Sequence, residues 1–123
     1  MRSCVVVLIG AETASRKWVQ YEIEEAWKRG KGIVGIYINK IKNSQGEQSQ
    51  KGDNPLKQFC IDKTFNYIVQ HSEPADENEI NLGNVCTTFE SIYQDSDNVY
   101  ADIKENIVDL IEEAIKIRNK YPR

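Results

Sequence analysis

An aromatic ring and a carboxylate stand four residues apart in an amphipathic stretch of the sequence. Trp18 and Glu22 would share one face of a helix, because residues at i and i+4 are neighbours on its surface. That face lies next to an apolar stripe through Val19 and Ile23. An indole beside a carboxylate reduces the contact of the carboxylate with water, which strengthens its hydrogen bonds to a bound hydroxyl. Glu22 is therefore a candidate catalytic residue, although by spacing alone an ordinary solvated helix carboxylate is the more common role.

A short turn precedes this stretch and follows a valine-rich run. In open α/β sheets, ligands bind outside the carboxyl ends of the strands, where such turns gather. Gly10 ends the run, and Thr13 or Ser15 is predicted to accept the free amide hydrogens at the start of the helix. We therefore expect Gly10, Thr13 and Trp18 to line a site beside Glu22.

The remaining chemistry-bearing residues form no recognisable motif. The sequence has no glycine-rich phosphate loop of the dinucleotide or Walker type. The single histidine, His71, has no ligand-like neighbour at metal spacing and belongs to no nucleophile motif. Cys4, Cys60 and Cys86 are an odd set without a Cys-x-x-Cys pair. These observations predict a reduced, cytoplasmic protein with no metal and no resident cofactor.

Length and charge exclude several classes of protein. The chain has 123 residues, enough for one domain. Sixteen basic and nineteen acidic residues give a net charge of -3, which argues against a broad nucleic-acid footprint. The longest apolar run, 4–9, is far shorter than the ~20 residues of a membrane-spanning helix. We expect neither a nucleic acid nor a membrane among the partners.

The first third of the chain predicts a strand, a helix and a second strand. Residues 4–9 are a continuous β-branched run, typical of a parallel strand covered on both faces. Residues 16–29 have helical periodicity and end before two glycines. Residues 33–38 are a second apolar run. Together they form a βαβ unit, and so an α/β fold with a parallel sheet.

The rest of the chain gives weaker signals until its end. Residues 39–54 are a polar connection, 65–69 a weak strand candidate, and 72–81 a solvated acidic loop. Residues 85–92 predict a third strand, and Asp95-Ser96-Asp97 can cap a final helix. One apolar stripe marks this helix: Tyr100, Ile103, Ile107, Leu110, Ile111, Ala114 and Ile115.

The order of these segments and the residues within them resemble those of the TIR-like proteins of the bacterial Thoeris anti-phage systems. The most specific part is the Trp-Val-x-x-Glu-Ile segment beside a valine-rich strand. The resemblance covers most of the chain and rests on Ser3 to Gly10, Thr13, Arg16 to Ile23, Ile33 to Ile38, Asn39 to Lys42, Gly46, Lys51-Gly52, Asn54 to Leu56, Asp97 and Tyr100.

The resemblance implies a flavodoxin-like parallel sheet and an activity on NAD as substrate. In TIR enzymes, a helix supplies a glutamate that engages the nicotinamide-side ribose while the N-glycosidic bond breaks. That glutamate corresponds to Glu22. A fixed carboxylate there favours the positive charge that develops on the ribose. Thoeris members cyclise the remaining ADP-ribose into a signal.

The chain departs from the family pattern at its start. Full-length members have two βα units ahead of the strand that corresponds to 4–9, so residues 1–123 match the C-terminal part of the family's domain. The expected consequence is an exposed apolar strand edge and an incomplete pocket. Three explanations remain open: a fragment or mis-assigned start, a separate chain that supplies the units, or two copies that pair through the edge.

Two other functions remain open. One is a non-catalytic TIR-like module that binds a partner through the sheet edge or helix surfaces, with Glu22 as a plain helix carboxylate. The other is a phosphoacceptor or flavin-binding member of the flavodoxin-like superfold. It is disfavoured because no Asp ends the valine-rich strand and because fold alone carries no function.

Overall fold

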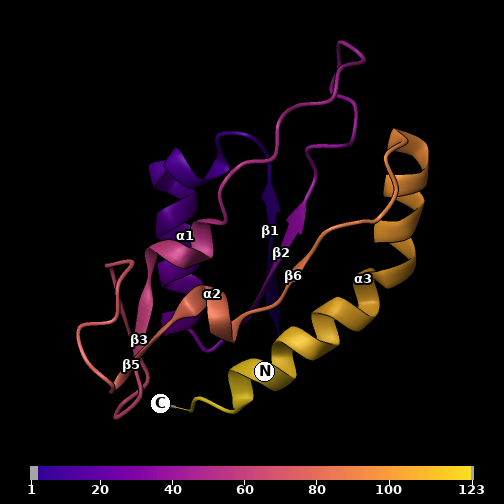
Figure 1. The fold of residues 1–123 in the computed structure, drawn as a ribbon. Coiled ribbons are helices and arrows are strands. Elements are labelled where there is room, and N and C mark those ends of the chain that lie inside the picture. Colours follow the sequence, from indigo (N-terminus) through magenta and orange to yellow (C-terminus); the bar gives the residue numbers. More distant parts are fainter. Residues whose placement is uncertain (1–2, 123) are drawn as a thin grey trace.

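A computed structural model describes residues 3–122. A parallel sheet lies between α1 and α3, and a second small sheet lies on the α1 side (Figure 1). None of the helices in the described range is both long and apolar enough to cross a membrane. The elements follow in the order β1 (Cys4–Ile9), η1 (Thr13–Ser15), α1 (Lys17–Lys28), β2 (Gly32–Tyr37), η2 (Pro55–Gln58), β3 (Cys60–Asp62), β4 (Tyr67–Val69), β5 (Glu79–Asn81), α2 (Leu82–Val85), β6 (Thr88–Phe89) and α3 (Ser96–Asn119).

The parallel sheet has the strand order β1-β2-β6. β1 pairs with β2 in parallel along its whole length, from Cys4 opposite Gly32 to Ile9 opposite Tyr37. The helix between them, α1, completes the predicted βαβ unit within one residue at each end. The predicted α/β class is therefore confirmed, and a parallel sheet with flanking helices is consistent with a flavodoxin-like fold.

β1 is more exposed than the sequence predicted. A strand covered on both faces would be buried throughout, whereas Leu8 is 53% exposed. The physical reason is its position: β1 forms one edge of the three-stranded sheet in the described part of the chain. β2, in the centre, is the strand that is buried along nearly all of its length.

α1 and α3 use opposite faces of the parallel sheet. Side chains alternate along a strand, so Ile33 joins the core under α1 while Val34 faces the other side. On that side α3 comes very close to β2: a Cβ on Gly32 would lie 2.7 Å from the Ala114 carbonyl carbon. Glycine at this strand position therefore permits the contact between helix and strand.

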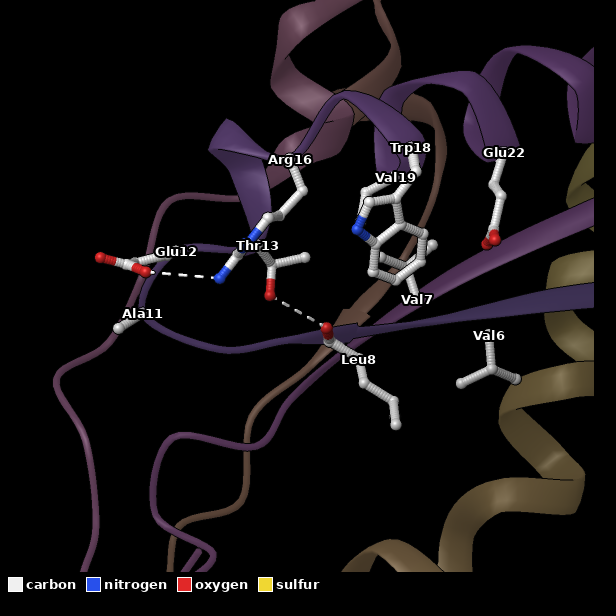
Figure 2. A pocket seen from close by; sticks show the side chains of 10 residues that line it. All are labelled: Val6, Val7, Leu8, Ala11, Glu12, Thr13, Arg16, Trp18, Val19 and Glu22. Carbon is white, nitrogen blue, oxygen red and sulfur yellow. Dashed lines mark hydrogen bonds and ion pairs between the residues drawn. The ribbon is translucent and has the colours of Figure 1, made fainter.

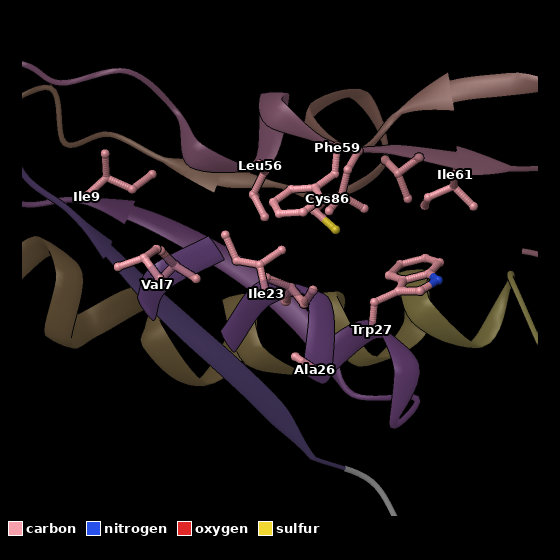
Figure 3. Close-up of a cluster of buried hydrophobic side chains, with 13 residues drawn as sticks. Val7, Ile9, Ile23, Ala26, Trp27, Leu56, Phe59, Ile61 and Cys86 are labelled. Atoms are coloured by element: carbon pink, nitrogen blue, oxygen red, sulfur yellow. The ribbon is translucent and has the colours of Figure 1, made fainter. Parts of the chain in front are cut away.

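The second sheet is antiparallel, with β3 between β4 and β5. Its apolar side packs on α1, so that Trp27, Phe59 and Ile61 share one core (Figure 3). The sequence predicted only β4, as a weak strand, and it predicted a loop where β5 lies. Strands of three residues hold too short a pattern for the alternation of side chains to be detected.

The segment predicted as a third strand, 85–92, is mostly something else. A four-residue helix, α2, ends at Val85, and the strand β6 covers only Thr88–Phe89. The side chain of Asn81 accepts a hydrogen bond from the Gly83 amide at 2.8 Å and so caps α2. Ile92 is 83% exposed, because β6 pairs with β2 over two residues only.

The final helix is confirmed with its cap. Asp95 accepts a hydrogen bond from the Asn98 amide at 3.2 Å, and α3 then runs for 24 residues. The predicted stripe is only partly buried. Ala114 is fully covered by β2, whereas Tyr100 is 60% exposed.

Candidate functional site

A groove of about 570 Å³ lies between α1 and the outer edge of β1. In Figure 2, Val7 points toward α1, while Val6 and Leu8 point the opposite way, so the edge of the strand itself forms the floor. Small-molecule sites commonly have this size and this mixture of apolar walls with few polar groups. The lining residues are Val6, Val7, Leu8, Ala11, Glu12, Thr13, Arg16, Trp18, Val19 and Glu22.

α1 brings Trp18 and Glu22 to the same groove. Val19 and Ile23 are buried and fix the rotation of the helix, which turns the neighbouring 18/22 face toward the edge of the sheet. Both side chains point from the helix toward β1 (Figure 2). The Trp18 ring is 63% exposed, so it offers an apolar face that a flat ligand could cover. The arrangement follows from the i, i+4 spacing, and the roles of the two residues stay predictions.

The turn after β1 is held by Thr13. Its hydroxyl accepts a hydrogen bond from the Gly10 amide at 2.8 Å and donates one to the Leu8 carbonyl at 3.3 Å. Gly10 lies beside the groove but is not among its lining residues. Since the hydroxyl hydrogen of Thr13 is engaged, Thr13 shapes the turn and offers a ligand only its remaining acceptor capacity.

The predicted helix cap is wrong. The structure inserts the short helix η1 at Thr13–Ser15, and Arg16 takes the N-cap position of α1 without a side-chain cap bond. The hydroxyl of Ser15 instead donates to the Glu12 carbonyl at 2.8 Å. The physical reason is that the Thr13 and Ser15 hydroxyls both form hydrogen bonds within the turn, so neither is used to cap the amides of α1.

Two charged residues of the groove were missed by sequence analysis. Arg16 and Glu12 form an ion pair with 3.6 Å between the guanidinium nitrogen and the carboxylate oxygen. Both side chains are exposed, so the pair contributes little to stability and can exchange partners. Arg16 also lies at the amino end of α1, where the helix dipole favours anions. The position of Arg16 directly before the helix was the sequence signal that could have identified it as a residue of the groove.

The polar connection after β2 supports the groove from outside. Gly52 packs against the turn so closely that a Cβ there would lie 2.7 Å from the Ala11 carbonyl oxygen. Next to it, Lys51 lies 2.8 Å from the carboxylate of Glu90 and 4.5 Å from the centre of the Tyr37 ring. The hydrogen bond to Glu90 raises the pKa of Lys51. This segment is therefore attached to the sheet and the turn.

A second group of polar side chains lies away from the groove, on the antiparallel sheet. His71 Nε2 is 2.5 Å from Glu79 Oε1, and both lie near the Cys60 thiol. The sequence shows no ligand-like neighbour of His71 at metal spacing, whereas the fold brings Glu79 and Cys60 close to it. The physical reason is strand pairing: β3 and β5 bring together residues that are far apart in the sequence.

The first part of the chain matches a known protein family. Residues 1–43 match the family model described as Thoeris protein ThsB, TIR-like domain. The chain is also similar to the protein named "Putative cyclic ADP-D-ribose synthase ThsB1" of Bacillus cereus (strain MSX-D12), with 45% identity over 54 residues. That alignment covers 44% of this chain and 28% of the relative's length.

The matched segment contains the complete βαβ unit and every lining residue of the groove. Glu22 and Trp18 both lie inside it. The model that matches residues 1–43 is therefore of the same family that the sequence resembles.

Proposed function

We propose that the groove binds NAD, cleaves its nicotinamide N-glycosidic bond and forms a cyclic ADP-ribose-type signal in anti-phage defence, with Glu22 as the catalytic carboxylate. The observation that carries the proposal is the meeting of Glu22 and Trp18 in one groove of small-molecule size. The Bacillus cereus relative, named "Putative cyclic ADP-D-ribose synthase ThsB1", supports the same chemistry.

The reaction needs little covalent help from the protein. The bond between ribose C1′ and the pyridinium nitrogen breaks, and its electron pair leaves with nicotinamide, which becomes neutral. An adenine nitrogen of the same molecule then attacks C1′ and a proton is released. Positive charge builds on the ribose in between, and a fixed carboxylate such as Glu22 stabilises it. Attack by water instead would make the protein a plain hydrolase.

Other lining residues suit the rest of the dinucleotide. The exposed Trp18 ring can stack on the flat nicotinamide. Arg16 can leave Glu12 and pair with the diphosphate, close to the amino end of α1. Thr13 and Gly10 hold the turn that brings these groups together. The remainder of the ligand would extend along the edge of β1.

The test compares purified wild type with Glu22→Gln and follows nicotinamide release from NAD. Glu24→Gln is the matched control, because Glu24 lies on the same helix but outside the groove. We expect Glu22→Gln to lower kcat by about 100-fold or more, the usual cost of losing one preorganised electrostatic group. Glu24→Gln should retain the wild-type rate. Equal release by wild type and Glu22→Gln, or no release by the wild type, would overturn the proposal.

The exposed edge of β1 favours a second candidate, a non-catalytic interaction module. In the described sheet β2 occupies only one side of β1, and Leu8 is 53% exposed. Unpaired strand edges promote pairing with another chain. This candidate predicts no nicotinamide release and self-association through β1. A folded monomer at micromolar concentration, measured by size-exclusion chromatography with light scattering, would contradict it.

A further inference from the structure

Three possible metal ligands converge on one face of the antiparallel sheet. Cys60 lies on the central strand β3, Glu79 on β5, and His71 just after β4. Cys60 pairs with Asn81 on one side and with Val69 on the other, so Glu79 and His71 are each two residues from those partners. Because side chains alternate along strands, Cys60 and Glu79 share one face of the sheet, and the segment after β4 brings His71 to them. Their ligand atoms lie within 4.8 Å of one another.

These three donors form a compact set. His71 Nε2 already lies 2.5 Å from Glu79 Oε1, and both atoms lie within 4.8 Å of the Cys60 thiol on the central strand. Around a tetrahedral ion, with bonds of about 2.0–2.3 Å, neighbouring ligand atoms are about 3.2–3.8 Å apart. A metal ion would therefore need the His71 and Glu79 ligand atoms to separate by about 0.7–1.3 Å, which side-chain rotation can supply.

The cluster is buried on the Cys60 side and open to solvent on the His71 side. Cys60 and its neighbour Ile61 are fully buried, so β3 is anchored in the core. The Glu79 side chain is 14% exposed and is held by the Ala75 amide at 3.0 Å. The His71 side chain is 43% exposed, and the segment that follows it is exposed throughout 72–77. An ion can thus enter from the His71 side and retain a water molecule there.

We propose that Cys60, His71 and Glu79 form a binding site for one Zn²⁺ ion, with three protein ligands and a fourth position for water. A thiolate and an imidazole select zinc over magnesium or calcium, which prefer oxygen ligands. The Ala75 amide, which hydrogen-bonds the Glu79 carboxylate at 3.0 Å, supplies the kind of outer contact that orients a ligand. This site lies on a different sheet from the groove, so it holds independently of any action on NAD.

The test uses the metal alone. Metal-free protein is titrated with Co²⁺ in place of Zn²⁺, and the thiolate-to-cobalt charge-transfer absorption is recorded, followed by displacement with Zn²⁺. We expect one equivalent of Co²⁺, an absorption band that Zn²⁺ abolishes, and no competition from Mg²⁺. Cys60→Ala should remove the band. His71→Gln and Glu79→Gln should each weaken binding by more than about 10-fold, the smallest effect expected even for an outer partner.

Matched controls separate the site from nonspecific binding. Cys4→Ser changes a cysteine of the other sheet, and Glu77→Gln changes an exposed acid of the neighbouring segment. Both should bind Co²⁺ like the wild type. Far-UV circular dichroism checks the fold of every variant, and the exposed position of His71 keeps that variant informative if Cys60→Ala unfolds. A wild type without the band, a band that survives Cys60→Ala, or binding unaffected by both His71→Gln and Glu79→Gln would overturn the proposal.

Discussion

Trp27 fixes the helix that carries Glu22, and its replacement gives a sharp test of the packing. The indole is fully buried at the end of α1, and its N–H donates to the Asn66 carbonyl at 2.8 Å. The Arg118 guanidinium lies 4.1 Å from the centre of the ring, and the Tyr121 ring lies 5.9 Å away. The substitution Trp27→Phe keeps an aromatic ring but removes the donor and part of the buried surface.

The expected loss is the sum of three effects. The hydrogen bond contributes about 1 kcal/mol net. A phenyl ring buries roughly 40 Å² less than an indole, which is about 1 kcal/mol at 25 cal/mol per Å². The weaker attraction between Arg118 and a phenyl ring adds about 0.5 kcal/mol. We therefore expect Trp27→Phe to lower the free energy of unfolding by about 2–3 kcal/mol.

The assay is urea unfolding followed by far-UV circular dichroism, which does not depend on tryptophan fluorescence. With a slope of about 1.5 kcal/mol per molar urea, the midpoint should fall by roughly 1.5 M. Trp18→Phe is the matched control: the same change on the same helix, at a ring that is 63% exposed. It should cost no more than about 0.5 kcal/mol. Equal midpoints for the two variants would refute the assignment of Trp27 as the anchor of α1.

Three further predictions concern stability. Burial raises the pKa of the Cys86 thiol from the ordinary 9.0 to about 12, so above pH 9 the unfolded state loses a proton that the folded state keeps. The Cys86 thiol should then lower stability as the pH rises from 9 toward 12, by up to about 1.4 kcal/mol per pH unit, and Cys86→Ala should reduce the slope measured by urea unfolding. Asp95→Ala removes the cap on the Asn98 amide and should cost about 1 kcal/mol in thermal unfolding; an unchanged Tm would contradict the cap. Gly52→Ala forces a methyl group against the turn after β1 and should cost about 1–3 kcal/mol, and a Tm equal to wild type would show that the contact is loose.

The sequence predicts the fold best where each element is long. β1, α1 and β2 were placed within one residue, because strands of six residues and a helix of twelve repeat their pattern enough to be read. The strands β3 and β5 have three residues each, and they form through pairing with each other and, for β3, with β4. Their stability comes from partners that are remote in the sequence, and no local signal encodes that.

The same distinction applies to the candidate sites. Trp18 and Glu22 were found because they lie on one helix, where a spacing of four residues means proximity. Thr13 was found as a residue of the turn, but its hydrogen bonds depend on the path of the backbone. The meeting of Cys60 with His71 and Glu79 depends on the register of three strands. The proximity of these three residues could therefore not be predicted from the sequence and is seen only in the folded structure.

Neighbouring side chains of the strand β3 point to opposite faces of its sheet. Ile61 points into the core that supports α1, while Cys60 beside it points to the histidine and the glutamate. An event at the thiol, whether an ion arriving or an oxidant, therefore acts one residue away from the surface on which the helix rests. The helix that carries Glu22 and the Cys60 thiol are therefore connected through the peptide unit that joins Cys60 to Ile61.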